Sequence, residues 1–353
     1  MPTAKYFKQV PPFPSGLPLA PLQKLSLKKL QDADEQESAS LFRAAREWGF
    51  CLIDLQSSAQ GESLLQLAEK MFDLTTKTFA LDYDELLRHA YNPPHDLTGY
   101  KRKGVLKTDD GKVDCMELYT VNQDDIVGNK PARSNAEPIE ANRATIKQFI
   151  EQSHGVVDVV ALQLERQLGL QPGAISSLSP LHEASDTSIR LLHAQPQSAK
   201  HREFITLGGH TDIDTITLLF NVVGGMQILP MGEERTGDKW LYVQPAPGHV
   251  IINFGDTLVE WTGGLLRTSL HRVVAAPGPQ SSVIRRSVAY LQRPRASASM
   301  RRLVGGRIPL IQEAEDDWGD VPVDDWAASR VRQIILGQLK PETRGGTARR
   351  VQV

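Results

Sequence analysis

Apolar residues in the first half of the chain recur at the spacing of amphipathic helices. Over residues 61–79, leucine, alanine and methionine follow one another at intervals of three and four, which places them on one helix face. The same spacing predicts helices over residues 32–48 and 138–168, and Gly169 is placed to end the second of these. Gly155 lies inside that long helix, where glycine costs roughly 1 kcal/mol relative to alanine, and marks a candidate bend.

After residue 186 the period changes to short apolar or alternating runs separated by Gly, Pro and Asp turns. Such runs are typical of two facing antiparallel sheets. We therefore expect a mainly β fold with flanking helices, in which a double-stranded β-helix, or jelly roll, follows an N-terminal helical and mixed region. The expected strands lie at residues 188–192, 215–220, 226–229, 239–243, 250–254, 270–275 and 287–291, with loops over 81–136 and a last helix at 325–339.

These patterns divide the chain into three regions. Residues 1–185 form an N-terminal region that contains helices and a segment expected to lie on the substrate side of the core. Residues 186–300 form the jelly-roll core, and residues 301–353 form a C-terminal helix and tail.

Composition narrows the class of protein. The 353 residues are 40% hydrophobic and 23% charged, enough for a sizeable core, and a net charge of −2 gives no electrostatic footprint for nucleic acid. No apolar run is long enough to predict a membrane span or a signal core. The two cysteines, Cys51 and Cys115, make no disulfide framework, so we expect a cytoplasmic protein.

Two histidines and an aspartate suggest a metal site. His210 and Asp212 are two residues apart, which puts both side chains on one face of a strand or of its terminal turn. His271 follows after enough chain for several strands and is expected on a neighbouring strand. Two imidazoles and one carboxylate, with the opposite positions open, form the ligand set of non-haem Fe(II) oxygenases. An H-x-D pair alone also fits a hydrogen-bonded structural histidine.

Arg285 and Ser287 form a second pair at strand spacing. They share a face, while Arg286 between them points the other way. A guanidinium beside a hydroxyl can bind one carboxylate end of a dicarboxylic acid through two charged hydrogen bonds and one neutral bond. The alternative without a binding role is a solvated basic strand edge that happens to carry a serine.

Together these segments resemble the isopenicillin N synthase-like family of Fe(II)- and 2-oxoglutarate-dependent dioxygenases. Seven elements of the family's C-terminal signature occur in order across about residues 205–294, and the segment from Ala44 to Ile53 is similar to the family's helix and first strand. The seven elements are His210-Thr211-Asp212, Gly225-Met226-Gln227-Ile228, Trp240-Leu241-Tyr242-Val243-Gln244-Pro245, Asn253-Phe254-Gly255-Asp256, Thr262-Gly263-Gly264, His271-Arg272-Val273 and Arg285-Arg286-Ser287.

The chain departs from the family at the strand that contacts the cosubstrate. A tyrosine often precedes the proline of that strand, whereas this chain has His193, Ala194 and Gln195 before Pro196. The family's hydrogen bond from this tyrosine to 2-oxoglutarate is therefore either lost or supplied by Gln195 or His193.

The resemblance implies an oxidoreductase that uses Fe(II), 2-oxoglutarate and O2, with ascorbate as a candidate reductant. His210, Asp212 and His271 would hold the iron, and Arg285 and Ser287 the far carboxylate of 2-oxoglutarate, which is decarboxylated to succinate and CO2. The expected reaction is hydroxylation of a small organic metabolite, of the kind found in secondary metabolism, by a monomer or weak homodimer. Two alternatives stay open: an Fe(II) oxidase or cyclase of the same fold that uses no 2-oxoglutarate, and a non-catalytic jelly-roll binding protein.

Overall fold

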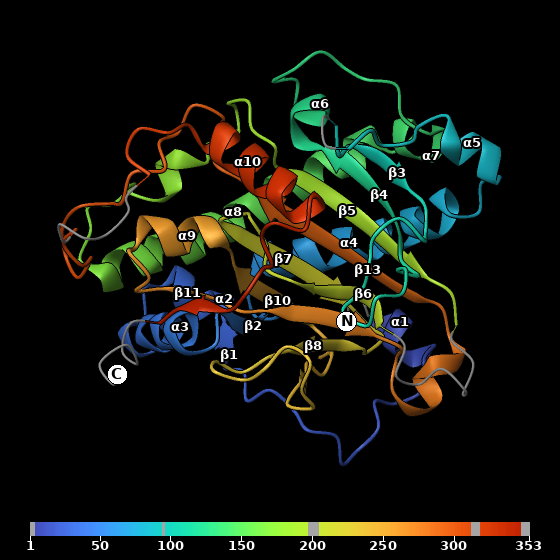
Figure 1. Ribbon diagram of the computed structural model, residues 1–353, viewed down its shortest axis with the longest axis horizontal. Helices are drawn as coiled ribbons and strands as arrows, with labels where there is room; N and C mark the ends of the chain where they lie inside the picture. The colour runs from blue at the N-terminus through green and yellow to red at the C-terminus, as the bar shows by residue number, and fades with distance from the viewer. Residues whose placement is uncertain (1–3, 94–95, 197–204, 312–317, 347–353) are drawn as a thin grey trace.

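The predicted jelly-roll core with flanking helices is confirmed. The computed structural model describes residues 4–93, 96–196, 205–311 and 318–346. In this part of the chain, an eight-stranded sheet faces a four-stranded sheet, and a two-stranded ribbon lies beside them. Helices cover the outer face of the larger sheet (Figure 1).

The larger sheet combines strands from both halves of the sequence. Its order is β1-β2-β10-β7-β13-β5-β4-β3, antiparallel except for the β1–β2 pair. The strands are β1 (Lys24–Ser26), β2 (Phe50–Asp54), β3 (Gly99–Lys101), β4 (Glu117–Asn122), β5 (Ser188–Ala194), β7 (Ile216–Asn221), β10 (His249–Phe254) and β13 (Arg285–Gln292).

The smaller sheet has the order β6-β12-β8-β9, with every neighbouring pair antiparallel. Its strands are β6 (Ile205–His210), β8 (Met226–Ile228), β9 (Leu241–Tyr242) and β12 (His271–Val274), and the ribbon pairs β11 (Arg267–Thr268) with β14 (Arg344–Gly345).

The helices of the described residues lie mostly before the core. The longest, α4 and α8, pack against each other and against β13 of the larger sheet. The helices are α1 (Ala4–Lys8), α2 (Leu27–Gln31), α3 (Glu35–Glu47), α4 (Ala59–Thr78), α5 (Tyr83–Leu87), α6 (Gln123–Val127), α7 (Glu137–Glu140), α8 (Arg143–Leu168), α9 (Asp256–Trp261) and α10 (Val323–Ile335), with 3₁₀ turns at Ser176–Leu178 and Gly278–Ser282.

The sequence pattern missed strands in the segment expected to be loops. Within residues 81–136, β4 pairs with β5 over six residues and β3 continues the sheet to its edge. These strands form because an extended neighbour offers them hydrogen-bond partners, which local residue preferences do not reveal. The N-terminal region thus extends the sheet of the core, and the boundaries at residues 185 and 300 stay a prediction.

The long helix differs from its predicted form at two points. It begins at Arg143 instead of residue 138, because the separate short helix α7 ends at Glu140, and the side chain of Asn142 donates to the carbonyl of Pro138 between the two helices. Gly155 does not interrupt it, since α8 is continuous from Arg143 to Leu168. The missing side chain at position 155 instead makes room for Gln60 of α4, because a Cβ there would lie 2.4 Å from the side-chain amide nitrogen of Gln60. As predicted, the helix ends at Gly169, with φ 71°.

A small apolar cluster fills the space between the two sheets. Phe50, Leu52 and Ile251 of the larger sheet contact Met226 and Ile228 of the smaller one. This cluster identifies the inner face of each strand, because side chains two residues apart on a strand share a face. No helix among the described residues has the length and apolar character needed to cross a membrane.

The contact between α4 and α8 predicts a coupled effect on stability. In the Gln60→Ala background, Gly155→Ala is expected to raise the free energy of unfolding by about 1 kcal/mol through helix propensity. In the wild-type background the gain is expected to be smaller, because the Gln60 amide must first move aside. Urea denaturation of the four proteins measures both effects, and equal gains in the two backgrounds would contradict this packing.

Candidate active site

His210 and His271 meet across the smaller sheet. His210 is the last residue of β6 and His271 the first of β12, and the antiparallel register places the two directly opposite each other. Their ring centroids are 4.3 Å apart. The prediction that His271 comes from a strand beside His210 is therefore confirmed.

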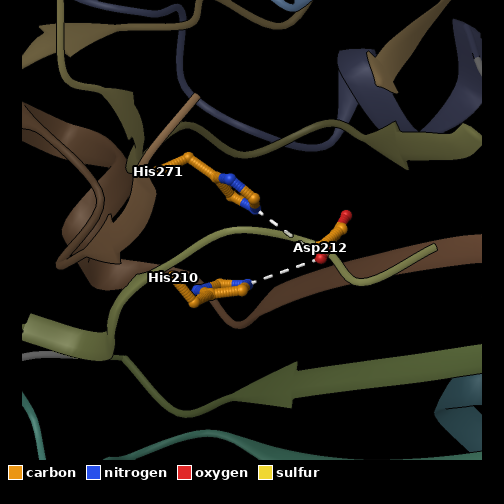
Figure 2. A group of neighbouring side chains, drawn as sticks. All are labelled: His210, Asp212 and His271. Atoms are coloured by element: carbon orange, nitrogen blue, oxygen red, sulfur yellow. Dashed lines mark ion pairs between the residues drawn. The ribbon is translucent and has the colours of Figure 1, made fainter. Parts of the chain in front are cut away.

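Asp212 completes the cluster from the loop that follows β6. Its Oδ1 lies 3.8 Å from Nε2 of His210 and 4.0 Å from Nε2 of His271. Figure 2 shows both rings directing a nitrogen toward this carboxylate. The three ligand atoms lie within 4.8 Å of one another, and in the part of the chain that the structure describes this is the group suited to a metal ion.

Backbone carbonyls orient both imidazoles for metal binding. Nδ1 of His210 donates to the carbonyl of Gly208 at 2.9 Å, and Nδ1 of His271 to that of Ser269 at 3.1 Å. A proton fixed on Nδ1 leaves the Nε2 lone pair free for a metal. Burial and the neighbouring His271 lower the pKa of His210 to about 4, so its ring is neutral at pH 7.

The outer oxygen of Asp212 is bound by the larger sheet. Thr217 of β7 and Asn253 of β10 both donate to Oδ2, at 3.0 and 2.5 Å. Burial raises the pKa of Asp212, but its electrostatic interactions with His271, His210 and Arg190 and the hydrogen bond from Thr217 outweigh burial, and the net shift is downward. Oδ1 is thus left, as a charged ligand atom, on the side of the histidines.

Asp256 connects the Asp212 loop to the C-terminal segment. Its backbone N–H donates to the carbonyl of Asp212 at 2.8 Å, and its fully buried carboxylate accepts from Arg330 of α10 at 2.6 Å. Arg344 of β14 lies 3.5 Å from the other carboxylate oxygen. Two cations from the last part of the described chain therefore neutralise the acid that supports the loop.

The ion pair between Asp109 and Arg235 also holds the end of β6 next to His210. Asp109 accepts from the backbone N–H of Gly209 at 2.7 Å and from Nε of Arg235, while Arg235 also donates to the carbonyl of Gly209. Both backbone groups of Gly209 are thereby fixed next to His210.

Other charged residues near the site have structural partners. Asp214 accepts from Nε of Arg293 at 2.6 Å. The guanidinium of Arg272 lies 4.2 Å from the ring centre of Trp240, on the face away from His271, as expected from strand alternation. His249, at the start of β10, donates to the carbonyl of Pro247 and is not part of the metal cluster.

Arg285 and Ser287 lie on the inner face of β13, as the spacing predicts. Nε of Arg285 donates to the carbonyl of Gly224 at 3.0 Å, and Nη1 to Oγ of Ser287 at 3.2 Å. Arg285 is 4% exposed, and burial lowers its pKa to about 10. No carboxylate of the described residues pairs with it, which leaves a buried cation without an anion.

Asn221 adds an unsatisfied donor to the same place. The register places it directly opposite Ser287 on β7, and its Nδ2 is buried without a hydrogen-bond partner. Thr217 lies on the same face of β7 and binds Asp212. A molecule bound between Asp212 and Arg285 would therefore run along this face and meet the Asn221 amide.

The structure does not bring His193 to Arg285. His193 pairs with Arg286 across β5 and β13, so it lies on the outer face of the sheet. There its ring stacks on Phe79, with centroids 4.8 Å apart. Ala194 is the residue opposite Arg285, and Gln195 is an exposed residue just beyond the end of β5.

Several residues that support the site were not singled out from the sequence. Asn253 lies in the Asn-x-Gly-Asp segment that was recognised, but its bond to Asp212 requires the pairing of β10 with β7. Asn221 and Thr217 carried a weaker signal, polar side chains at alternate positions of an apolar strand.

Comparisons with known proteins agree with this site. Residues 185–294 match the model of the 2OG-Fe(II) oxygenase superfamily, and residues 17–143 match the model described as non-haem dioxygenase in morphine synthesis N-terminal. The chain is 30% identical over 319 residues to the 2-oxoglutarate-dependent dioxygenase frbH of Dothideomycetidae sp. (strain 11243), covering 88% of this chain and 92% of that protein.

Other similar proteins are more distant in sequence. Gibberellin 2-beta-dioxygenase 8 of Arabidopsis thaliana is 26% identical over 278 residues, which cover 77% of this chain and 74% of that protein. The crystal structure of a full-length Neurospora crassa protein in complex with alpha-KG superimposes with a TM-score of 0.73 at 20% identity, covering 90% of this chain and 97% of that chain. The chain belongs to the Fe(II)- and 2-oxoglutarate-dependent dioxygenases.

Proposed function

We propose that this dioxygenase hydroxylates a small organic metabolite, with iron held by His210, Asp212 and His271 and 2-oxoglutarate held by Arg285 and Ser287. The observation that carries this proposal is the buried Arg285, which has no acidic partner in the described residues and faces the same interior as Asp212. A buried cation without an anion is unfavourable, and the carboxylate of a bound dicarboxylic acid removes that cost.

The residues present fit both groups. Two imidazoles and one carboxylate on a single side suit Fe(II) and leave the opposite positions for the cosubstrate and O2. The orphaned amide of Asn221 adds a third donor beside Arg285 and Ser287. When bound, iron and 2-oxoglutarate supply the activation of O2 and the oxidation of a C–H bond.

The protein's own part in the reaction is to orient these groups and to exclude water. Thr217 and Asn253 hold one oxygen of Asp212, so the other stays directed at the metal position. Phe50 contacts the His271 ring edge-on at 5.3 Å and keeps that side of the site apolar. Formation of succinate in step with product, dependent on added Fe(II) and 2-oxoglutarate, tests this function.

Gln195 remains our candidate to supply the missing tyrosine's hydrogen bond, because it follows Ala194 at the end of the cosubstrate strand. We also infer a cytoplasmic protein that is a monomer or weak homodimer. Cys51 and Cys115 are both free thiols, which suits a reducing compartment that keeps iron in the ferrous state.

Replacement of the proposed iron ligands should abolish turnover. His210→Ala, Asp212→Ala and His271→Ala each remove one ligand, so iron content after anaerobic loading and succinate formation are expected to fall together. His249→Ala, remote from the cluster, is the control and should keep both. A triad variant that retained full iron and activity would show that the metal is bound elsewhere.

Asn253 should strengthen metal binding although it is not itself a metal ligand. Asn253→Ala removes a hydrogen bond that orients Asp212, and changes of this kind typically weaken metal binding about 10- to 100-fold. Titration of the metal-free protein with Fe(II) under anaerobic conditions measures the effect. The His249→Ala protein, changed on the same strand β10, should bind Fe(II) as the wild type does; equal affinities in all three proteins would contradict the role given to Asn253.

The carboxylate clamp predicts a graded loss of cosubstrate binding. Arg285→Ala removes a charged contact of roughly 2–3 kcal/mol, so the affinity for 2-oxoglutarate should fall about 30- to 150-fold. Ser287→Ala loses a neutral hydrogen bond of about 1 kcal/mol, or roughly fivefold. Arg286→Ala, changed on the outer face, is the matched control. Calorimetric titration with 2-oxoglutarate decides, and unchanged affinity in Arg285→Ala would move the clamp to other residues.

A further inference from the structure

A second arginine lies on the inner face of the larger sheet. Arg190, in the middle of β5, is directly opposite Ala289 on β13 and Thr120 on β4. Because Ala289 is two residues from Ser287 and four from Arg285, all of these side chains share one face. Arg190 thus faces the same interior as the carboxylate clamp.

Arg190 has no partner in the described part of the chain. No hydrogen bond or ion pair joins it to a described residue, and its side chain is half-buried. Lys101, another cation on this face, is neutralised by Asp114 and also donates to the carbonyl of Met116 at 2.8 Å. Arg285 donates to Gly224 and Ser287. Among the described residues of this face, Arg190 is therefore the cation that has neither an anionic partner nor a neutral acceptor.

The charge of Arg190 reaches the iron ligands without contacting them. It acts on the pKa of Asp212, after burial and the two histidines, and on that of His210, after burial, His271, Asp212 and the hydrogen bond with Gly208. No oxygen of Asp212 lies within ion-pair distance of Arg190, and Oδ2 already accepts from Thr217 and Asn253. Arg190 therefore influences the proposed metal ligands without being bound to them.

Arg190 is also separate from the 2-oxoglutarate clamp. Ala194, the residue opposite Arg285, is four residues along β5, which is about 13 Å at the usual rise of a strand. On the side of Arg190 toward the clamp, its inner-face neighbours are Leu192 on β5 and Leu118 on β4, and Leu219 lies beyond Ala289 on β7. On the other side lie Ser188 and Asn122. The three leucines form an apolar wall that offers contacts for a carbon skeleton.

We infer that Arg190 binds a carboxylate of the organic substrate, so that the enzyme oxidises a small carboxylic acid whose carbon skeleton lies against the apolar wall. This inference rests on the proposed function. A guanidinium binds a carboxylate through two parallel hydrogen bonds, which fixes the orientation of the molecule as well as its position. The Thr120 hydroxyl, directly across β4, lies beside the same position. Arg190 thereby determines which carbon faces the metal.

The test compares acids with their neutral amides. The full chain is loaded with Fe(II) and 2-oxoglutarate without O2, and titrated calorimetrically with a set of aliphatic and aromatic monocarboxylic acids and the matching primary amides. We expect acids of the set to bind at least about tenfold, and up to about 150-fold, more tightly than their amides. Equal affinity of acids and amides, or no binding by any acid, would overturn the inference.

Variants then assign the preference to Arg190. Arg190→Gln should remove the difference between acid and amide, and Arg190→Lys should keep part of it, because lysine retains the charge but not the paired donors. Arg286→Gln, on the outer face of the sheet, should bind the acids as the wild type does. If Arg190→Gln still preferred acids, or if it lost 2-oxoglutarate affinity as Arg285→Ala does, Arg190 would not be the substrate's anchor.

A separate measurement distinguishes this inference from the proposed function. With O2 admitted, the wild type should convert 2-oxoglutarate to succinate, and an acid that binds should accelerate that conversion while its amide does not. No succinate at all would refute the proposed function itself. Succinate formation that responds equally to acids and amides would leave the dioxygenase function standing and refute only the role of Arg190.

Discussion

The opposition of His210 and His271 across β6 and β12 is the constraint on which the rest of the site depends. Two residues paired in an antiparallel ladder have fixed separation and direction, so the two imidazoles need no further device to bring them together. The sheet thus sets the spacing of the two proposed histidine ligands, and the loop after β6 places the carboxylate of Asp212 between them.

That carboxylate joins the two sheets. Asp212 follows a strand of the smaller sheet, while the donors that hold its outer oxygen, Thr217 and Asn253, belong to the larger one. The proposed metal position therefore lies where the sheets meet, and the inner face of β13 leads from it to Arg285. A shift of one sheet against the other would separate the proposed ligands. Apolar residues such as Phe50 pack between the sheets beside them and oppose such a shift.

The sequence predicted the parts of the site that are encoded in local spacing. His210 with Asp212, and Arg285 with Ser287, are two residues apart on one strand or its end, so their shared face follows from strand geometry alone. Asn253, Asn221 and Arg190 could not be assigned in this way, because their roles depend on which strands become neighbours. The strands β3 and β4 were missed for the same reason, since pairing with β5 gives them their structure.

The ion pairs of Asp256 affect the order in which parts of the chain become stable during synthesis. The acid that supports the Asp212 loop is neutralised by Arg330 and Arg344, which leave the ribosome last among the residues of this network. Until they are present, a fully buried carboxylate beside the metal loop lacks its counter-ions, a state that is strongly unfavourable. The jelly roll can begin to form earlier during synthesis, but the loop that carries Asp212 becomes stable only when the segment with Arg330 and Arg344 docks, so the proposed metal site is complete only after these residues have been synthesised.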